Sequence, residues 1–320
     1  MPGSDQKINY QLRPSKSIER KMLCEIVKDI QIIHGNREMR YIGMGAKYFS
    51  DFLLFHNEFG ISDMISIEAE VEKRKRYEFN KPLKNIEMKY GSTNMILPQI
   101  ENFEDKFNVV WLDYDDAFCD GMLKDLETIC RKIDVGSLFL ISCNASVGGD
   151  NQKQKQNAFI DRMGDYYLGD TDHRLFTNKK IPFVIRKHFN HVVKKSITKR
   201  NVLQDTKLEY MQLLFFSYSD GAPMITIGGF LVDDALKQKV LDYGLLEKYP
   251  FIVDGEEFFE IKIPKLTYKE IQLILENIPL TQEEYSVNSE SYHGIGFDEI
   301  QQFQKIYRYY PYYMEGSIHT

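Results

Sequence analysis

The chain of 320 residues is 43% apolar and 13% aromatic, which is enough to bury a large core and excludes a disordered protein. Its formal net charge of -6 argues against binding polyanions over its whole surface. No window reaches the roughly 18 apolar residues of a membrane span, and the N-terminus lacks the apolar core of a signal peptide. We therefore expect a cytoplasmic protein with no membrane partner.

Three regions follow one another along the chain. Residues 1–36 are predicted to form an arm and a helix that stops at Gly35. Residues 37–232 carry strands and helices in alternation, but this pattern loosens in an insertion at 146–207. Residues 233–320 are predicted to be a mainly helical extension.

The α/β region begins with five apolar runs that are separated by helical patterns. Alternating units of this kind predict a parallel sheet with right-handed crossovers and a ligand at the carboxyl ends of the strands. The predicted strands span residues 39–42, 64–67, 85–90, 108–112 and 137–142. The predicted helices include residues 48–59, 72–76 and 122–133.

Two β-rich runs, 210–219 and 224–232, flank Asp220-Gly221 and predict an antiparallel hairpin. The complete prediction is a Rossmann-like, doubly wound sheet of seven mostly parallel strands that ends in this hairpin. In the extension, Thr267 and Glu270 have the spacing of a capping box at the start of a helix.

Three strands end in residues that suit a nucleoside cofactor: Gly43-Met44-Gly45, Glu68 and Asp113. A glycine turn lets backbone N–H groups approach a ligand, and an acid after the second strand can accept hydrogen bonds from ribose hydroxyls. Glu68 follows Gly45 at close to the roughly 20-residue spacing of such pairs. The third glycine of the dinucleotide fingerprint is absent, which disfavours a nicotinamide dehydrogenase.

Three segments carry a family resemblance. They are Ile67-Glu68, the run Gly-Ser-Thr-Asn-Met-Ile-Leu-Pro-Gln-Ile at 91–100, and Trp-Leu-Asp-Tyr-Asp-Asp at 111–116. With them, the chain resembles class I S-adenosylmethionine-dependent methyltransferases, and within these the catechol O-methyltransferase-like enzymes. The resemblance covers residues 39–145 and extends more weakly to residue 232 through the hairpin.

The resemblance implies S-adenosyl-L-methionine as the cofactor and assigns a role to each strand end. Gly43 and Gly45 would line the methionine part of the cofactor, Glu68 would hold its ribose, and Ser92 would lie beside its adenine. Asp113 would stand next to the transferring methyl group as the catalytic residue, and it would also contact the cofactor.

Catechol-type enzymes also bind magnesium through the acid of strand four and an Asp-Asn pair after strand five. In this chain Asp113 and Asn144 match two of these ligands, whereas Cys143 replaces the remaining carboxylate. Asp116 stands where the family has its lysine base. The predicted metal ligands are therefore Asp113 and Asn144.

The end of strand four lacks the Asn/Asp-Pro-Pro-Tyr motif of amino-methylating families and the Pro-Cys pair of the cytosine-carbon family. Lys16 and Asp113 could supply the first two members of the Lys-Asp-Lys-Glu set of ribose-methylating enzymes, but strand five carries no lysine. By elimination we predict an enzyme that methylates an oxygen of a small-molecule or unusual acceptor.

The alternative prediction is a binding or regulatory protein of the same fold with weak or no catalytic activity. Its motivation is the departures at Asp116 and Cys143, together with a basic segment at 179–200 that has eight Lys or Arg and no acid. Such a segment would contact nucleic acid or a partner protein.

Overall fold

The computed structural model describes residues 13–311 except residues 36, 204–205 and 254. The predicted tip of the N-terminal arm, residues 1–12, thus lies outside the described residues. Among the helices of the described part, none combines the length and the apolar character that crossing a membrane requires.

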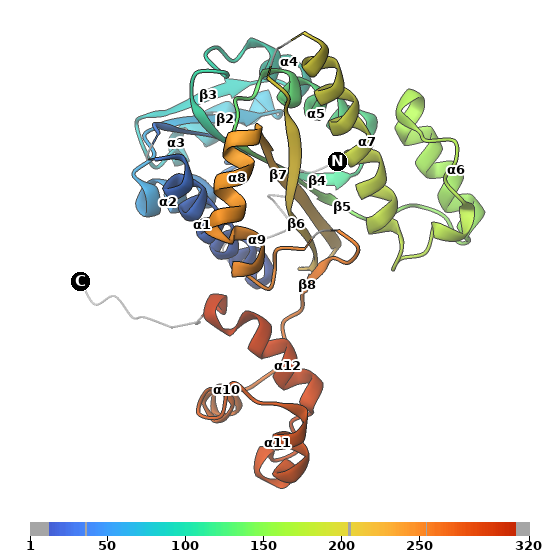
Figure 1. The fold of residues 1–320 in the computed structure, drawn as a ribbon. Coiled ribbons are helices and arrows are strands. Elements are labelled where there is room, and N and C mark those ends of the chain that lie inside the picture. Colours follow the sequence, from blue (N-terminus) through green and yellow to red (C-terminus); the bar gives the residue numbers. More distant parts are fainter. Residues whose placement is uncertain (1–12, 36, 204–205, 254, 312–320) are drawn as a thin grey trace.

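Within the described residues, one sheet of eight strands organises the molecule in the order β3-β2-β1-β4-β5-β7-β6-β8 (Figure 1). Strands β1 to β5 are parallel, and β7 runs antiparallel between β5 and β6. The predicted Rossmann-like sheet and its hairpin are confirmed, and a short strand β8 adds to the predicted seven. The bounds are β1 Met39–Gly43, β2 Asp63–Glu68, β3 Ile86–Tyr90, β4 Phe107–Ala117, β5 Leu138–Asn144, β6 Glu209–Ser219, β7 Pro223–Val232 and β8 Phe259–Ile261.

Helices cover both faces of the sheet (Figure 1). The first of them ends where Gly35 adopts the left-handed conformation with φ 78°, as its position in the sequence predicts. The helices are α1 Pro14–His34, α2 Ser50–Phe59, α3 Arg74–Asn80, α4 Thr93–Ile96, α5 Asp120–Lys132, α6 Gln152–Met163, α7 Ile181–Val202, α8 Asp234–Tyr243, α9 Leu245–Lys248, α10 Tyr268–Leu275, α11 Gln282–Val287 and α12 Phe297–Ile306.

Strand β4 shows how two cores form on one sheet. Successive side chains of a strand point to opposite faces, so Val109 and Trp111 face one way and Val110 and Leu112 the other. The first pair belongs to a core with α1, α2 and α8, and the second pair to a core with α5 and α7. Burial on both faces explains why these strands are continuous apolar runs.

The longest helix of the predicted insertion is α7, which connects β5 to β6 as a crossover and packs on α5. Its buried side includes Ile185, Phe189 and Val193. Lysines and arginines lie between these residues, and they make the helical spacing of the apolar residues hard to recognise in the sequence. Much of the basic segment 179–200 is therefore the outer side of a sheet-covering helix.

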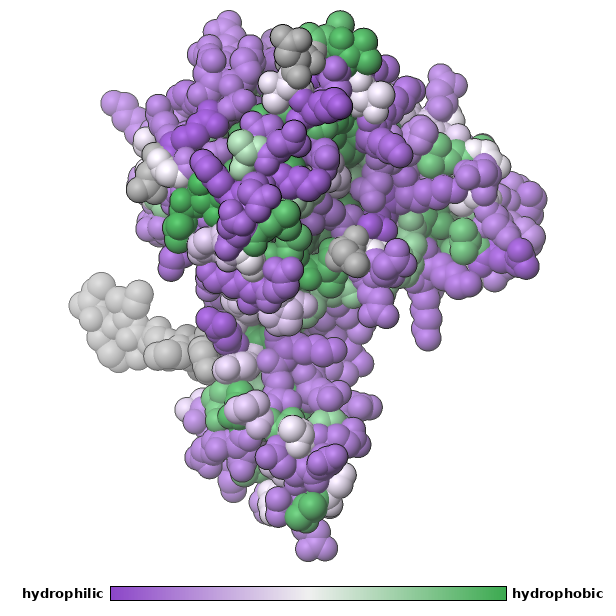
Figure 2. All heavy atoms as spheres, viewed as in Figure 1, coloured by the Kyte–Doolittle hydropathy of each residue, from purple (hydrophilic) through white to green (hydrophobic). Residues whose placement is uncertain are grey.

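Helices α10 to α12 are grouped beneath the sheet, after β8 (Figure 1). They share a small core of their own, in which Ile274, Ile300 and Phe303 are buried. The predicted capping box is present, because the Glu270 N–H donates to Thr267 Oγ1 at 3.3 Å and the Thr267 N–H donates to Glu270 Oε2 at 2.6 Å. Figure 2 shows hydrophilic residues over most of the visible face of this group.

One basic residue of α7 stabilises the packing of α7 on α5. Arg200 donates hydrogen bonds to the carbonyl oxygens of Cys130 and Ile133, at 3.2 and 2.5 Å, beside the C-terminus of α5. We expect Arg200→Met to lower the free energy of unfolding by about 1–3 kcal/mol, because buried carbonyls lose a charged donor. Urea denaturation measures this loss. The exposed neighbour Lys199, changed to Met, should alter stability by less than about 0.5 kcal/mol; equal losses would contradict the assignment.

Candidate functional site

The glycine turn follows β1 and folds back over its own strand. A Cβ atom on Gly43 would lie 2.5 Å from the hydroxyl of Tyr41, and one on Gly45 would overlap the ring of Phe49. Neither position can therefore carry a side chain without moving a buried aromatic ring. The Tyr41 and Phe49 side chains therefore pack directly against the backbone of the turn, and both glycines are buried.

Strand β2 holds this turn in place from the neighbouring position in the sheet. The Gly45 N–H donates to Ser66 Oγ at 3.0 Å, and the Ala46 N–H donates to Glu68 Oε1 at 2.9 Å. The Ser66 hydroxyl also donates to Glu68 Oε1, at 2.7 Å. The structure thus brings the predicted residues Gly45 and Glu68 together at one edge.

Burial raises the pKa of the Glu68 carboxyl to about 7, although hydrogen bonds from Ser66, Ala46 and Gly45 act in the opposite direction. The free protein therefore carries at this position an acid that changes protonation near neutral pH. An acid that is costly to ionise in the free protein gains most from hydrogen-bond donors supplied by a ligand.

Ser92 lies exposed after β3, at the start of α4. The loop around it is tied to α5 by Asp125, whose carboxylate accepts from Asn94 Nδ2 and from the Tyr114 hydroxyl, both at 2.5 Å, and from the Thr93 hydroxyl. Burial raises the pKa of Asp125, while these hydrogen bonds lower it. The cluster fixes the segment after β3 relative to the last part of β4 and to α5.

Asp113 pairs with Ser142 of β5 in the sheet register, and its side chain meets a lysine from outside the α/β region. Lys16 Nζ, on the first turn of α1, lies 2.8 Å from Asp113 Oδ1. Burial alone would raise the pKa of Asp113, but the Lys16 ammonium outweighs it and holds the pKa below its ordinary value. Strand β4 continues to Ala117, past its predicted end, and Asp115 and Asp116 are exposed residues within it.

Each of the two predicted metal ligands already has a partner within the protein. The Asp113 carboxylate is paired with the Lys16 ammonium, and Asn144 Oδ1 accepts the Ser146 N–H of its own loop at 2.8 Å. Across the described ranges, His, Cys, Asp and Glu form no group of three or more that could hold a metal ion. The donor set around Asp113 and Asn144 does not fit magnesium, and we derive no chemical step through a metal.

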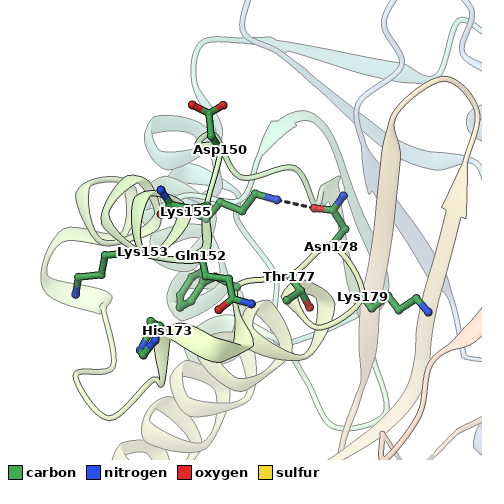
Figure 3. A pocket seen from close by; sticks show the side chains of 10 residues that line it. Asp150, Gln152, Lys153, Lys155, His173, Thr177, Asn178 and Lys179 are labelled. Atoms are coloured by element: carbon green, nitrogen blue, oxygen red, sulfur yellow. Dashed lines mark hydrogen bonds between the residues drawn. The ribbon is translucent and has the colours of Figure 1, made fainter.

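The insertion forms a shallow pocket between the start of α6 and the segment before α7 (Figure 3). Lys155 crosses it and donates to Asn178 Oδ1 at 2.8 Å, while Lys153 and Lys179 point away from each other. None of the predicted cofactor residues lines this pocket. The pocket and the strand-end site are thus separate features of the surface.

The sheet order, the terminal antiparallel hairpin and the acid that closes β2 define the class I S-adenosylmethionine-dependent methyltransferases. More particularly, the chain matches over residues 8–318 the family described as "Putative O-methyltransferase", and it belongs to that family. A search among curated proteins finds no match to this chain.

Solved structures with low sequence identity also match. LepI with SAH and a substrate analogue is 10% identical with a TM-score of 0.35, and the match covers 61% of this chain and 44% of LepI, less than half of that relative. A "putative O-methyltransferase from Klebsiella pneumoniae" is 11% identical with a TM-score of 0.36, and the match covers 66% of this chain and 79% of that one. The SAH-bound Podospora anserina methyltransferase PaMTH1 is 13% identical with a TM-score of 0.33, over 71% and 82%.

The sequence placed Lys16 with Asp113 only as a candidate for the ribose-methylating set, and it assigned no role to Glu19, Ser142 or Tyr218. Lys16 and Glu19 lie on the buried stripe of α1 that continues through Met22, Leu23 and Ile26. Charged residues on an otherwise apolar helix face are the one local signal that could have marked them.

The raised pKa of Glu68 predicts a pH-dependent stability of the free protein. The stabilising effect of its protonated form is fully present below about pH 4.5 and is lost as pH rises through about 7. Relative to Glu68→Gln, the native protein should therefore lose thermal stability across this window and change little above it. Melting temperatures at a series of pH values measure the difference. Glu72→Gln, at an exposed position, is the control, and its melting temperature should change with pH as that of the native protein does. The same behaviour in Glu68→Gln would contradict the prediction.

Proposed function

We propose that the protein transfers a methyl group from S-adenosylmethionine to an oxygen atom of a small-molecule acceptor. The observation that carries the proposal is the contact between the glycine turn and Glu68 at the carboxyl edge of the sheet. This edge is where parallel α/β sheets bind their ligands. The family match over residues 8–318 supports methyl transfer to oxygen.

The cofactor fits the chemistry of the three strand ends. The methionine part would lie against the turn at Gly43 and Gly45, and the Glu68 carboxylate would accept the two ribose hydroxyls. Ser92 would contact the adenine from its fixed loop. A ribose diol supplies the donors that favour the ionised form of Glu68, so the raised pKa of this buried acid supports the assignment.

When bound, S-adenosylmethionine supplies the methyl group, which passes from sulfur to the acceptor oxygen as the carbon–sulfur bond breaks and its electron pair stays on sulfur. The site contributes mainly by aligning the two reactants. Asp113 is the catalytic residue in this proposal and accepts the proton that leaves the acceptor hydroxyl. A carboxylate with a lowered pKa suffices, because an oxygen that is gaining a methyl group becomes a strong acid.

The end of β4 supports oxygen as the acceptor atom. Its sequence, Asp113-Tyr114-Asp115-Asp116, differs from the motifs of the amino-methylating and cytosine-carbon families. The family match favours this enzymatic role over the binding role that the sequence predicts for segment 179–200. In that segment Arg200 is also engaged in packing α7 on α5, and Lys187 pairs with Asp170 at 2.8 Å.

Calorimetry with S-adenosylhomocysteine tests the cofactor site. We expect the native protein to bind it and Glu68→Ala to bind at least tenfold more weakly, because each lost hydrogen bond to a charged acceptor is worth about 1.5–3 kcal/mol. Glu72→Ala, an exposed acid just beyond β2, is the matched control and should bind as the native protein does.

Two results would contradict the cofactor assignment. One is the absence of binding to the native protein, and the other is undiminished binding by Glu68→Ala. The acceptor class is tested with methyl-labelled S-adenosylmethionine and matched pairs of small alcohols, phenols and amines. Label transferred to the hydroxyl compounds supports oxygen methylation, whereas transfer to the amines alone contradicts it.

A further inference from the structure

The ammonium group of Lys16 is enclosed by oxygen atoms and aromatic rings at the carboxyl ends of the central strands. It lies 2.8 Å from Asp113 Oδ1, 2.7 Å from Glu19 Oε2, 3.2 Å from the Tyr218 hydroxyl and 3.3 Å from Ser142 Oγ. It also lies 4.2 Å from the centre of the Trp111 ring. The side chain has no exposed surface, so this is a built site rather than a surface contact.

The start of α1 is fixed so that Lys16 points to this place. Asp220, in the turn between β6 and β7, accepts the backbone N–H groups of Ser15 and Lys16 at 3.2 and 3.1 Å. Arg13 Nε lies 3.8 Å from the same carboxylate. A residue of the hairpin turn thus caps a helix that lies about two hundred positions earlier in the chain.

Two acids, Asp113 and Glu19, face the Lys16 ammonium. Burial alone would lower the pKa of Lys16, but the carboxylates of Asp113 and Glu19 outweigh it and raise the pKa. Burial raises the pKa of Glu19 despite the opposing effect of Lys16. The hydroxyl of Thr226 is hydrogen-bonded to Glu19 and completes its surroundings. Of the two acids, Asp113 has the lowered pKa, and it is the ionised partner of Lys16 at the exposed side of the cluster.

The geometry leaves one oxygen of Asp113 for chemistry. Its Oδ1 is used by Lys16, whereas in the described part of the chain Oδ2 has no hydrogen bond. The Asp113 side chain is 12% exposed and that of Lys16 is 0% exposed. The carboxylate therefore separates the lysine from the open edge of the sheet, and only Asp113 can meet a ligand.

We propose that Lys16 is a positioning residue of the methyl-transfer site, and that its ammonium is a permanent cation that holds Asp113 ionised with Oδ2 toward the cofactor sulfur and the acceptor hydroxyl. The inference rests on the proposed function. It makes α1, which precedes the α/β region, part of the reaction centre. It also accounts for the poor fit of magnesium, because the position beside Asp113 already holds a positive charge.

The ratio of affinities for S-adenosylmethionine and S-adenosylhomocysteine tests this inference without an acceptor. The two compounds share the ribose and adenine, so effects at Glu68 cancel, and they differ in the positive sulfur that would face Asp113. We expect Lys16→Met to reduce the preference for S-adenosylmethionine about tenfold, because an unpaired buried Asp113 is neutralised or turned aside. Lys16→Arg, which retains the charge, should keep most of the preference.

Two controls separate this role from a loss of folding. Lys28→Met removes an exposed lysine of the same helix and should leave the ratio unchanged. In the Asp113→Asn background, Lys16→Met should have no further effect on the ratio, and this pair of variants decides the question even if Lys16→Met alone fails to fold.

An unchanged or increased preference in Lys16→Met overturns the inference, as does a further loss in the Asp113→Asn background. Loss of stability in Lys16→Met with an unchanged ratio shows a structural role only, and also overturns it. If the native protein binds neither compound, the proposed function fails. If it binds both, and the ratio of affinities is the same in Lys16→Met, only the inference about Lys16 fails.

Discussion

The enclosure of one ammonium group at the ends of β4, β5 and β6 is the interaction on which the arrangement of the site depends. Lys16 joins a helix that precedes the sheet to the strands that form its centre. Because a buried charge is costly unless it is paired and hydrogen-bonded, the position of every group around it is constrained. This constraint sets the orientation of the Asp113 side chain and the charge at the carboxyl edge of the sheet.

The glycine turn and Glu68 form a second unit with the opposite energetic character. Burial makes Glu68 difficult to ionise, and Ala46 and Phe49 adopt left-handed backbone angles of φ 46° and 49° that cost about 1–2 kcal/mol each. The rest of the domain has to offset this local strain. Such costs concentrate at ligand sites, where shape and charge are set for the bound state. The Lys16 ammonium has its hydrogen-bond partners within the protein, whereas the Glu68 carboxyl group would gain further donors from a ligand.

The sequence predicted the order of strands and helices because apolar runs and turn residues are local signals. It also predicted Glu68 and Asp113 at a common edge, since the carboxyl ends of parallel strands meet there. It did not predict α7 as a buried-face helix, because lysines fill the gaps between its apolar residues, nor β8, which is only three residues long. The contacts of Lys16 with Ser142 and Tyr218 were not predicted for another reason: these partners lie 126 and 202 positions away, and no local pattern encodes such pairs.

The cap that Asp220 provides for α1 has a consequence for how the molecule is assembled. Its carboxylate and the backbone that it binds are 205 positions apart, so this cap can form only when the turn between β6 and β7 is in place. Long loops must close before such contacts contribute, which makes them late events in folding. During synthesis, α1 therefore gains this cap only after most of the α/β region has been made. The contact between the glycine turn and Glu68 has no such dependence, because its strands are close neighbours in the chain.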